Sequence, residues 1–164
     1  MKSINQYISN AERLSSIDDY IIEKFKLSSK NLGSIYHPKT KEELEELVKK
    51  LIKERGNDAD LNDIDVSNIE DMSQLFYGSS FNGDISQWDV SNVKNMTKLF
   101  SLSKFNGDIS EWDVSNVENM YKMFTRSKFS RDISKWNVDK VKKNFAMFRF
   151  CPLEKNPPKW YKIL

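Results

Sequence analysis

The chain of 164 residues has little of the chemistry that most enzymes use, with one cysteine, Cys151, and one histidine, His37. A single cysteine excludes an internal disulfide and a cysteine-based zinc cluster. The sequence also lacks a glycine-rich phosphate loop, a nucleophile elbow and clustered His or Cys ligands. We therefore expect no catalytic residue, no metal and no cofactor, and we interpret Cys151 as a small buried residue near the C-terminus.

Long apolar runs are absent as well. No stretch approaches the roughly 20 apolar residues that span a bilayer. The first residues, MKSINQYISNAERL, lack the apolar core and cleavage site of a secretory signal. We therefore predict a cytoplasmic protein without a membrane partner. A phage or other mobile element as the source of its gene is a further hypothesis, about genetic context only.

Charge is unevenly distributed although the net charge is only +2. Residues 1–59 carry a net +1, residues 60–135 a net −4 and residues 136–164 a net +5. A basic end attracts nucleic acid or an acidic protein surface. Cations without a recognised nucleic-acid motif are more typical of a solvated cap, so contact with a nucleoprotein complex through the basic C-terminal end is kept as an alternative.

Much of the chain consists of sequence repeats. The segment FNGDISQWDVSNVKNMTKLF begins at Phe81, and FNGDISEWDVSNVENMYKMF begins 24 residues later at Phe105. A weaker copy begins at Ile64 and a degenerate one at Phe129. The period is also visible in four tryptophans, Trp88, Trp112, Trp136 and Trp160. A fixed period of this size predicts a solenoid, in which each unit buries its apolar face against its neighbours.

Each repeat predicts one strand and one helix. Asp84 to Trp88 is a short extended run after the turn pair Asn82-Gly83, and Ser91 starts a stretch with apolar residues at helical spacing. We therefore predict an α/β repeat, a leucine-rich-repeat-like solenoid of short strand plus helix units. Stacking would place like residues over like, in columns such as Phe81, Phe105 and Phe129, or Ile85, Ile109 and Ile133.

The first third of the chain predicts helices. Two short helices or one broken helix are indicated before residue 27, followed by a loop to Tyr36. A stronger helix is expected from Thr40, an N-cap with Glu43 three residues on, to Gly56, whose place suits a left-handed C-cap. This helix is expected to cover the open end of the first repeat. The predicted divisions are residues 1–59 for the helical segment and cap, 60–150 for the four repeats and 151–164 for a C-terminal cap.

Repeated aspartates raise the question of a metal ladder. Asp84, Asp108 and Asp132 recur with the period, but their spacing is not that of a calcium loop and each repeat offers few oxygens. Asp and Asn satisfy backbone donors in tight turns. We favour this structural role over metal binding.

These repeats resemble the BspA-like leucine-rich repeats of bacterial surface proteins. The resemblance rests on W-D-V-S-N-V-x-N-M-x-x-x-F joined to F-N-x-D-I-S, over Leu61 to about Trp160, with residues 37–56 similar to the helical lead-in of such arrays. The resemblance implies a strand-and-helix solenoid, a binding or adhesion role and no catalytic residues.

We predict a non-enzymatic module that binds another protein. Recognition is expected where residues vary on a constant frame, with these partner-binding candidates: Tyr77, Gln87, Lys94, Ser101, Glu111, Glu118, Thr125, Lys135 and Lys142. One alternative is an inhibitor of a nucleic-acid enzyme such as a host defence nuclease, which would use the acidic repeats as a phosphate mimic or the basic end as a nucleic-acid contact. Another is a fragment of a surface adhesin.

Overall fold

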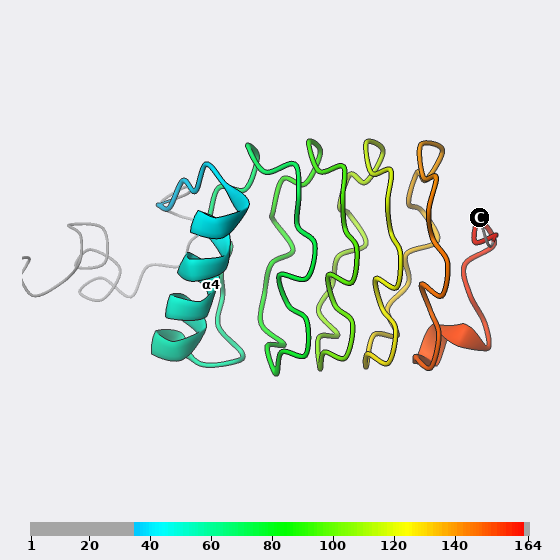
Figure 1. Cartoon of the computed structure of the whole chain (residues 1–164). Coiled ribbons are helices and arrows are strands. Elements are labelled where there is room, and N and C mark those ends of the chain that lie inside the picture. Colours follow the sequence, from blue (N-terminus) through cyan, green and yellow to red (C-terminus); the bar gives the residue numbers. More distant parts are fainter. Residues whose placement is uncertain (1–34, 163–164) are drawn as a thin grey trace, which may run out of the picture.

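The computed structural model describes residues 35–162, which form a stack of coils with a helix at one end (Figure 1). Helix α4 (Lys41–Arg55) lies across the N-terminal end of the stack, and a short 3-10 helix, η1 (Pro152–Glu154), lies near the other end. Each 24-residue repeat makes one coil. The helices predicted before residue 27 lie outside the described residues, and the divisions at residues 59 and 150 stay predictions.

Helix α4 confirms the strongest local prediction. The Glu43 amide donates to the Thr40 hydroxyl at 3.2 Å, and the Glu43 carboxylate accepts from the Lys39 amide at 2.7 Å, so both sides of the cap are made. Gly56 ends the helix with φ of +93°. The apolar stripe faces the first coil with Leu44, Val48 and Leu51 buried.

Polar contacts of Lys41 and Arg55 tie α4 to the first coil. The Lys41 ammonium donates to the Ser73 hydroxyl at 2.6 Å. The Arg55 guanidinium donates to both carboxylate oxygens of Asp63, at 3.0 and 2.8 Å, and Asp63 is buried. Burial works against the charge on Arg55, yet the contact with Asp63 outweighs it and raises the pKa of Arg55. A bidentate, partly buried pair of this kind fixes the helix on the end of the stack.

The predicted α/β class is wrong. Within residues 35–162 the only helices are α4 and η1, and pairing between coils is limited to isolated parallel bridges: Tyr36 with Ile64, Asp60 with Asp84, Asp71 with Asn95, Asn95 with Asn119, and Asn119 with Lys143. The stretches expected to be strands and helices are successions of turns. The coils are therefore not strand–helix units.

Turns replace the predicted helices because the backbone bonds of this stretch are shared between two coils. In the second coil the amides of alternate residues donate to the third coil: Met96 to Asn119, Lys98 to Tyr121, Phe100 to Met123 and Leu102 to Thr125, at 2.8–3.0 Å. The amides between them close turns within the coil, such as Leu99 to Met96 and Ser101 to Lys98. Lys98 and Leu102 take the left-handed conformation, with φ of 54° and 61°. A helix cannot continue through such residues.

Aromatic columns fill the interior, as the expected stacking of Phe81, Phe105 and Phe129 requires. Their ring centroids are 6.2 and 6.4 Å apart in consecutive coils, and all three side chains are fully buried. A second column has spacings of 5.6, 5.7 and 5.9 Å and consists of Phe76, Phe100, Phe124 and Phe148. Burying each such ring contributes roughly 1.5–3 kcal/mol, so these columns account for much of the stability of the stack.

The tryptophans link neighbouring coils by both stacking and hydrogen bonds. Each indole nitrogen donates to a carbonyl 27 residues earlier, at 2.8–3.1 Å, in the pairs Trp88–Leu61, Trp112–Ile85, Trp136–Ile109 and Trp160–Ile133. Trp160 also stacks on Trp136, and the ring of Tyr161 meets Phe148 edge-on at 4.8 Å. These rings cover the last coil where the prolines stop the repeat.

Candidate recognition surface

The nine predicted partner-binding residues form three columns whose members recur every 24 residues: Gln87, Glu111 and Lys135; Lys94, Glu118 and Lys142; and Tyr77, Ser101 and Thr125. Two of these columns contain surface ion pairs between coils. Lys94 contacts Glu70 at 2.8 Å, and Lys142 contacts Glu118 at 2.8 Å. The Lys142 hydrogen bond lowers the pKa of Glu118. The other column is looser, with Lys135 at 3.5 Å from Glu111 and Gln87 exposed above them. Charges paired within the protein are less available to a partner.

The third predicted column is mostly structural. The Ser101 hydroxyl is buried and donates to the Thr125 carbonyl at 3.1 Å, and the Thr125 hydroxyl donates to the Ala146 carbonyl at 2.6 Å. Tyr77 alone remains well exposed in this column. Within residues 35–162 no hydrogen bond or ion pair joins one of the three predicted columns to another, so the structure does not gather these nine residues into one site.

The aspartates have the turn role that we favoured. Asp84, Asp108 and Asp132 each accept from the amide of the serine two residues on, at 2.9, 3.0 and 2.8 Å. The Ser110 and Ser134 amides and hydroxyls lower the pKa values of Asp108 and Asp132. Among the described residues, no group of three or more His, Cys, Asp or Glu side chains is placed to hold a metal ion.

Cys151 and His37 take part in separate local contacts. Cys151 is buried, and burial raises the pKa of its thiol, which disfavours the reactive thiolate. The His37 ring nitrogen Nδ1 lies 3.2 Å from the Asp65 carboxylate. Neither geometry is that of a nucleophile with its base.

The sequence reasoning missed a different surface, which we call the basic–aromatic strip. It consists of residues 73–80, 97–104, 121–128 and 145–150, the turn-rich part of each coil. These segments contain no Asp or Glu, and they contain six cations, namely Lys98, Lys104, Lys122, Arg126, Lys128 and Arg149. None of the six forms an ion pair with a residue in the described part of the chain.

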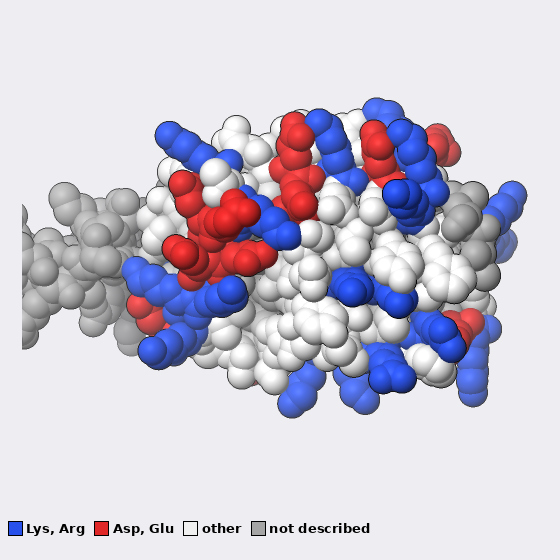
Figure 2. Space-filling model, viewed as in Figure 1, with Lys and Arg blue, Asp and Glu red and all other residues white. Residues whose placement is uncertain are grey.

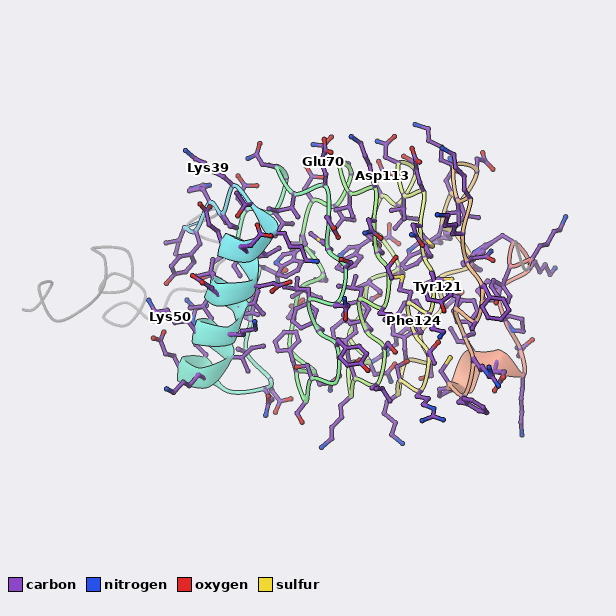
Figure 3. All side chains as sticks on the ribbon, in the orientation of Figure 1. Lys39, Lys50, Glu70, Asp113, Tyr121 and Phe124 are labelled. Atoms are coloured by element: carbon purple, nitrogen blue, oxygen red, sulfur yellow. The ribbon has the colours of Figure 1, made fainter. Side chains whose placement is uncertain are left out.

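The distribution of charge differs between the two long edges of the stack. Figure 2 shows basic and acidic side chains side by side along the upper edge of the stack, whereas basic ones predominate along the lower edge. Figure 3 places Glu70 and Asp113 at the upper edge and Tyr121 on the broad face beside it. Lysines at the edge are paired with carboxylates of the next coil, while those of the strip remain available.

Exposed apolar side chains are concentrated in the same strip. Within residues 35–162 the large apolar side chains that are exposed are Tyr77 at 47%, Leu102 at 43%, Phe145 at 52% and Phe150 at 55%. All four belong to the strip. Exposed apolar groups concentrated in one part of a surface are typical of a site of interaction.

Cations and rings of the strip are in direct contact. The guanidinium carbons of Arg126 and Arg149 lie 5.3 and 4.9 Å from the centre of the Phe150 ring. The Lys122 ammonium lies 4.9 Å from the ring centre of Tyr121, and that ring stacks on Phe145 at 6.3 Å. Each exposed cation–π contact contributes about 0.5–1 kcal/mol. The contacts hold long side chains in place at the surface.

Backbone strain is confined to this strip as well. Seven non-glycine residues in the described part of the chain have positive φ, and all lie in the strip: Gln74, Lys98, Leu102, Lys122, Arg126, Ala146 and Phe150. Each costs roughly 1–2 kcal/mol relative to right-handed backbone. Glycine would meet this requirement at lower cost, as it does at Gly78 in the first coil. These positions recur every 24 residues, so the positive φ belongs to the regular geometry of each coil, and Lys, Arg and Phe occupy it in this strip.

A comparison with known protein families identifies the group to which these coils belong. Residues 42–160 match the family described as "Mycoplasma protein of unknown function, DUF285". The chain belongs to this family. The match includes α4 almost completely and all of the basic–aromatic strip. No curated protein and no solved structure matches this DUF285 chain.

Membrane insertion has no helix to support it in the described DUF285 region. Within residues 35–162 no helix has both the length and the apolar character that crossing a bilayer requires.

The strip has a signal in the sequence that could have revealed it. In the segments that begin at Thr97 and Tyr121, TKLFSLSK and YKMFTRSK, two lysines recur with the 24-residue period and acidic residues are missing. The helices predicted at the start of these segments would distribute the side chains around an axis. In the turn conformation Lys104 and Lys128 are exposed, and Lys98 and Lys122 are half-buried.

Proposed function

We propose that this member of the DUF285 family is a non-enzymatic recognition module that binds another protein through the basic–aromatic strip. The observation that carries the proposal is the difference between paired and unpaired cations. Lys94, Lys135 and Lys142 contact glutamates of neighbouring coils, whereas the six cations of the strip contact no carboxylate of the described chain. Unpaired cations beside exposed Tyr and Phe have the composition of interface hot spots, which are rich in Tyr, Trp and Arg.

A rigid frame supports the proposed role. The strip residues are anchored by the ladder of amide bonds between coils and by the fully buried Phe76 column beneath them. Binding to such a surface orders few additional groups, which lowers the entropic cost of association. The resemblance of the repeats to BspA-like arrays, for which binding roles are expected, gives independent support to recognition over catalysis.

The acidic edge gives less support to the alternative of a phosphate mimic for a nuclease. Glu70 and Glu118 are neutralised by Lys94 and Lys142 at 2.8 Å, so this edge presents alternating charges and not a continuous negative row. A cytoplasmic or surface location stays a prediction.

Site-specific crosslinking tests the proposed surface. A photoreactive phenylalanine analogue would replace Phe145, which is 52% exposed on the strip, and in a matched variant Gln87, which is exposed in a predicted column outside it. In cells that naturally contain the protein, we expect a discrete protein adduct from position 145 and none from position 87. Adding Arg126→Ala and Arg149→Ala should abolish the adduct.

Three results would contradict the proposal. They are an adduct of equal yield from both positions, an adduct that the arginine substitutions leave unchanged, or no protein adduct from position 145.

A further inference from the structure

We infer that the strip binds an acidic segment of the partner in extended conformation, lying along the axis of the stack with carboxylates at alternate residues. This inference rests on the proposed function and adds the chemistry and the conformation of what is bound. It follows from the charge of the strip, from the spacing of its coils and from the state of its aromatic rings.

Charge indicates an acidic ligand. The strip carries six cations and no carboxylate, and the cations have no ion-pair partner within residues 35–162. At the edge of the same coils, glutamates of the neighbouring coil form ion pairs with the lysines. A ligand with carboxylates in a row would provide such ion-pair partners for the cations of the strip.

Coil spacing indicates an extended ligand. Equivalent aromatic rings in consecutive coils are 5.6–6.5 Å apart. An extended peptide advances about 6.4–6.8 Å over two residues, and residues two apart point to the same side. Lys98 and Lys122 occupy equivalent positions one coil apart, as do Lys104 and Lys128. Carboxylates at alternate residues therefore meet successive lysines, and flexible lysine side chains absorb the small mismatch.

The aromatic rings favour a peptide over single-stranded nucleic acid. Proteins bind such strands by stacking bases on open ring faces. Here two guanidinium groups lie over Phe150, and Tyr121 already contacts Lys122 and Phe145. A guanidinium placed against a ring is well suited to paired hydrogen bonds with a carboxylate. The rings therefore orient the cations of the strip and do not serve as stacking platforms for bases.

Two labelled peptides of identical composition test the inference by fluorescence anisotropy with the full chain. In one, Glu alternates with Thr, so an extended conformation presents every carboxylate on one face. The other repeats Glu-Glu-Thr-Thr and presents half of its carboxylates on each face. We expect the alternating peptide to bind about three- to tenfold more tightly, because several surface ion pairs of modest strength are lost in the other.

Matched variants locate the binding. Lys98→Gln with Lys122→Gln removes two charges from the strip, and Lys135→Gln with Lys142→Gln removes two from the paired columns. We expect the first pair to weaken binding of the alternating peptide by about tenfold and the second by less than about twofold. Thermal midpoints within about 2 °C of wild type would show that both variants are folded.

Several outcomes would overturn the inference. Equal affinity for the two peptides would exclude an extended register, and equal loss in the two variants would exclude the strip. Tighter binding of a single-stranded oligothymidylate than of either peptide would make the strip a nucleic-acid surface. If neither peptide binds while crosslinking from position 145 still captures a protein, this inference fails and the proposed function stands.

Discussion

Phe105→Ala is the sharpest test of how the stack is held together. Phe105 is fully buried at the start of the third coil, with ring centroids of four other phenylalanines within 6.4 Å: Phe76, Phe81, Phe100 and Phe129. The nearest, Phe100, is at 4.3 Å. Removing the ring takes away contacts on both sides of the column.

The cavity left by this change cannot collapse easily. Backbone bonds on either side hold the coils at fixed separation, with the Lys104 amide donating to Ser79 at 3.0 Å and the Lys128 amide to Ser103 at 3.1 Å. Phe→Ala in a core costs about 3–5 kcal/mol, and a site that relaxes little lies in the upper part of that range. With a slope near 2 kcal/mol per molar urea, a loss of about 4 kcal/mol lowers the urea midpoint by about 2 M.

Two comparison variants serve as controls for the Phe105→Ala result. Among the described residues Phe129 stacks on two rings, Phe105 and Phe124, which is two fewer than Phe105 has. At 0.5–1.5 kcal/mol for each ring pair, Phe129→Ala should therefore cost about 1–3 kcal/mol less. Lys104→Ala, next to Phe105 in the chain but exposed and without an ion pair among residues 35–162, should change stability by less than about 0.5 kcal/mol. Similar urea midpoints for the Phe105 and Lys104 variants would refute the conclusion that the aromatic columns hold the coils together.

Two further predictions concern turns and titration. Gly78→Ala should cost about 1 kcal/mol, because a Cβ meets no atom within 4 Å and only the positive φ of 65° opposes it. Gly83→Ala should cost about 2–3 kcal/mol, because its Cβ would collide with the Ala59 carbonyl oxygen and lie 2.7 Å from the Phe81 ring; equal urea midpoints for the two variants would contradict this distinction. On acidification, stability should be lost as pH falls below about 4, because hydrogen bonds from serine hydroxyls and amides lower the folded-state pKa values of Asp65, Asp108, Asp113 and Asp132 below the unfolded value of about 3.9. This contribution is present above that value, and urea midpoints measured from pH 7 to pH 2 check it, while a midpoint that does not change with pH would exclude it. Asp113→Asn should reduce the pH dependence and keep the turn, since Asn137 accepts the equivalent bond from the Asp139 amide at 3.1 Å.

Helix α4 shows what local sequence determines reliably. Its cap at Thr40, its apolar stripe and its end at Gly56 depend on residues within one turn of each other, and all were predictable. The stacking of the repeats was equally predictable from the sequence. A 24-residue period in Phe and Trp requires like residues to stack when consecutive repeats pack, and the aromatic columns do so.

The conformation inside each coil was not predictable by the same means. Val93, Met96, Leu99 and Phe100 have the three- and four-residue spacing of a helix face, but a succession of tight turns buries residues at similar intervals. Which one forms is decided by the partner of each amide. The Lys98 amide donates to the Tyr121 carbonyl of the next coil, a contact that exists only after stacking. A local sequence pattern therefore does not predict a hydrogen bond to another coil.

The candidate surface divides in the same way. The chain by itself determined that residues 97–104 and 121–128 are basic, free of carboxylates and repeated. Only the tertiary structure decided that Lys122 and Tyr121 lie beside Phe145 and that Arg126 lies over Phe150. It also decided that Ser101 and Thr125 turn inward to carbonyls of the next coil. The physical reason is that left-handed residues at positions such as Lys98 and Arg126 set the direction of each side chain, and the bonds between coils impose that conformation.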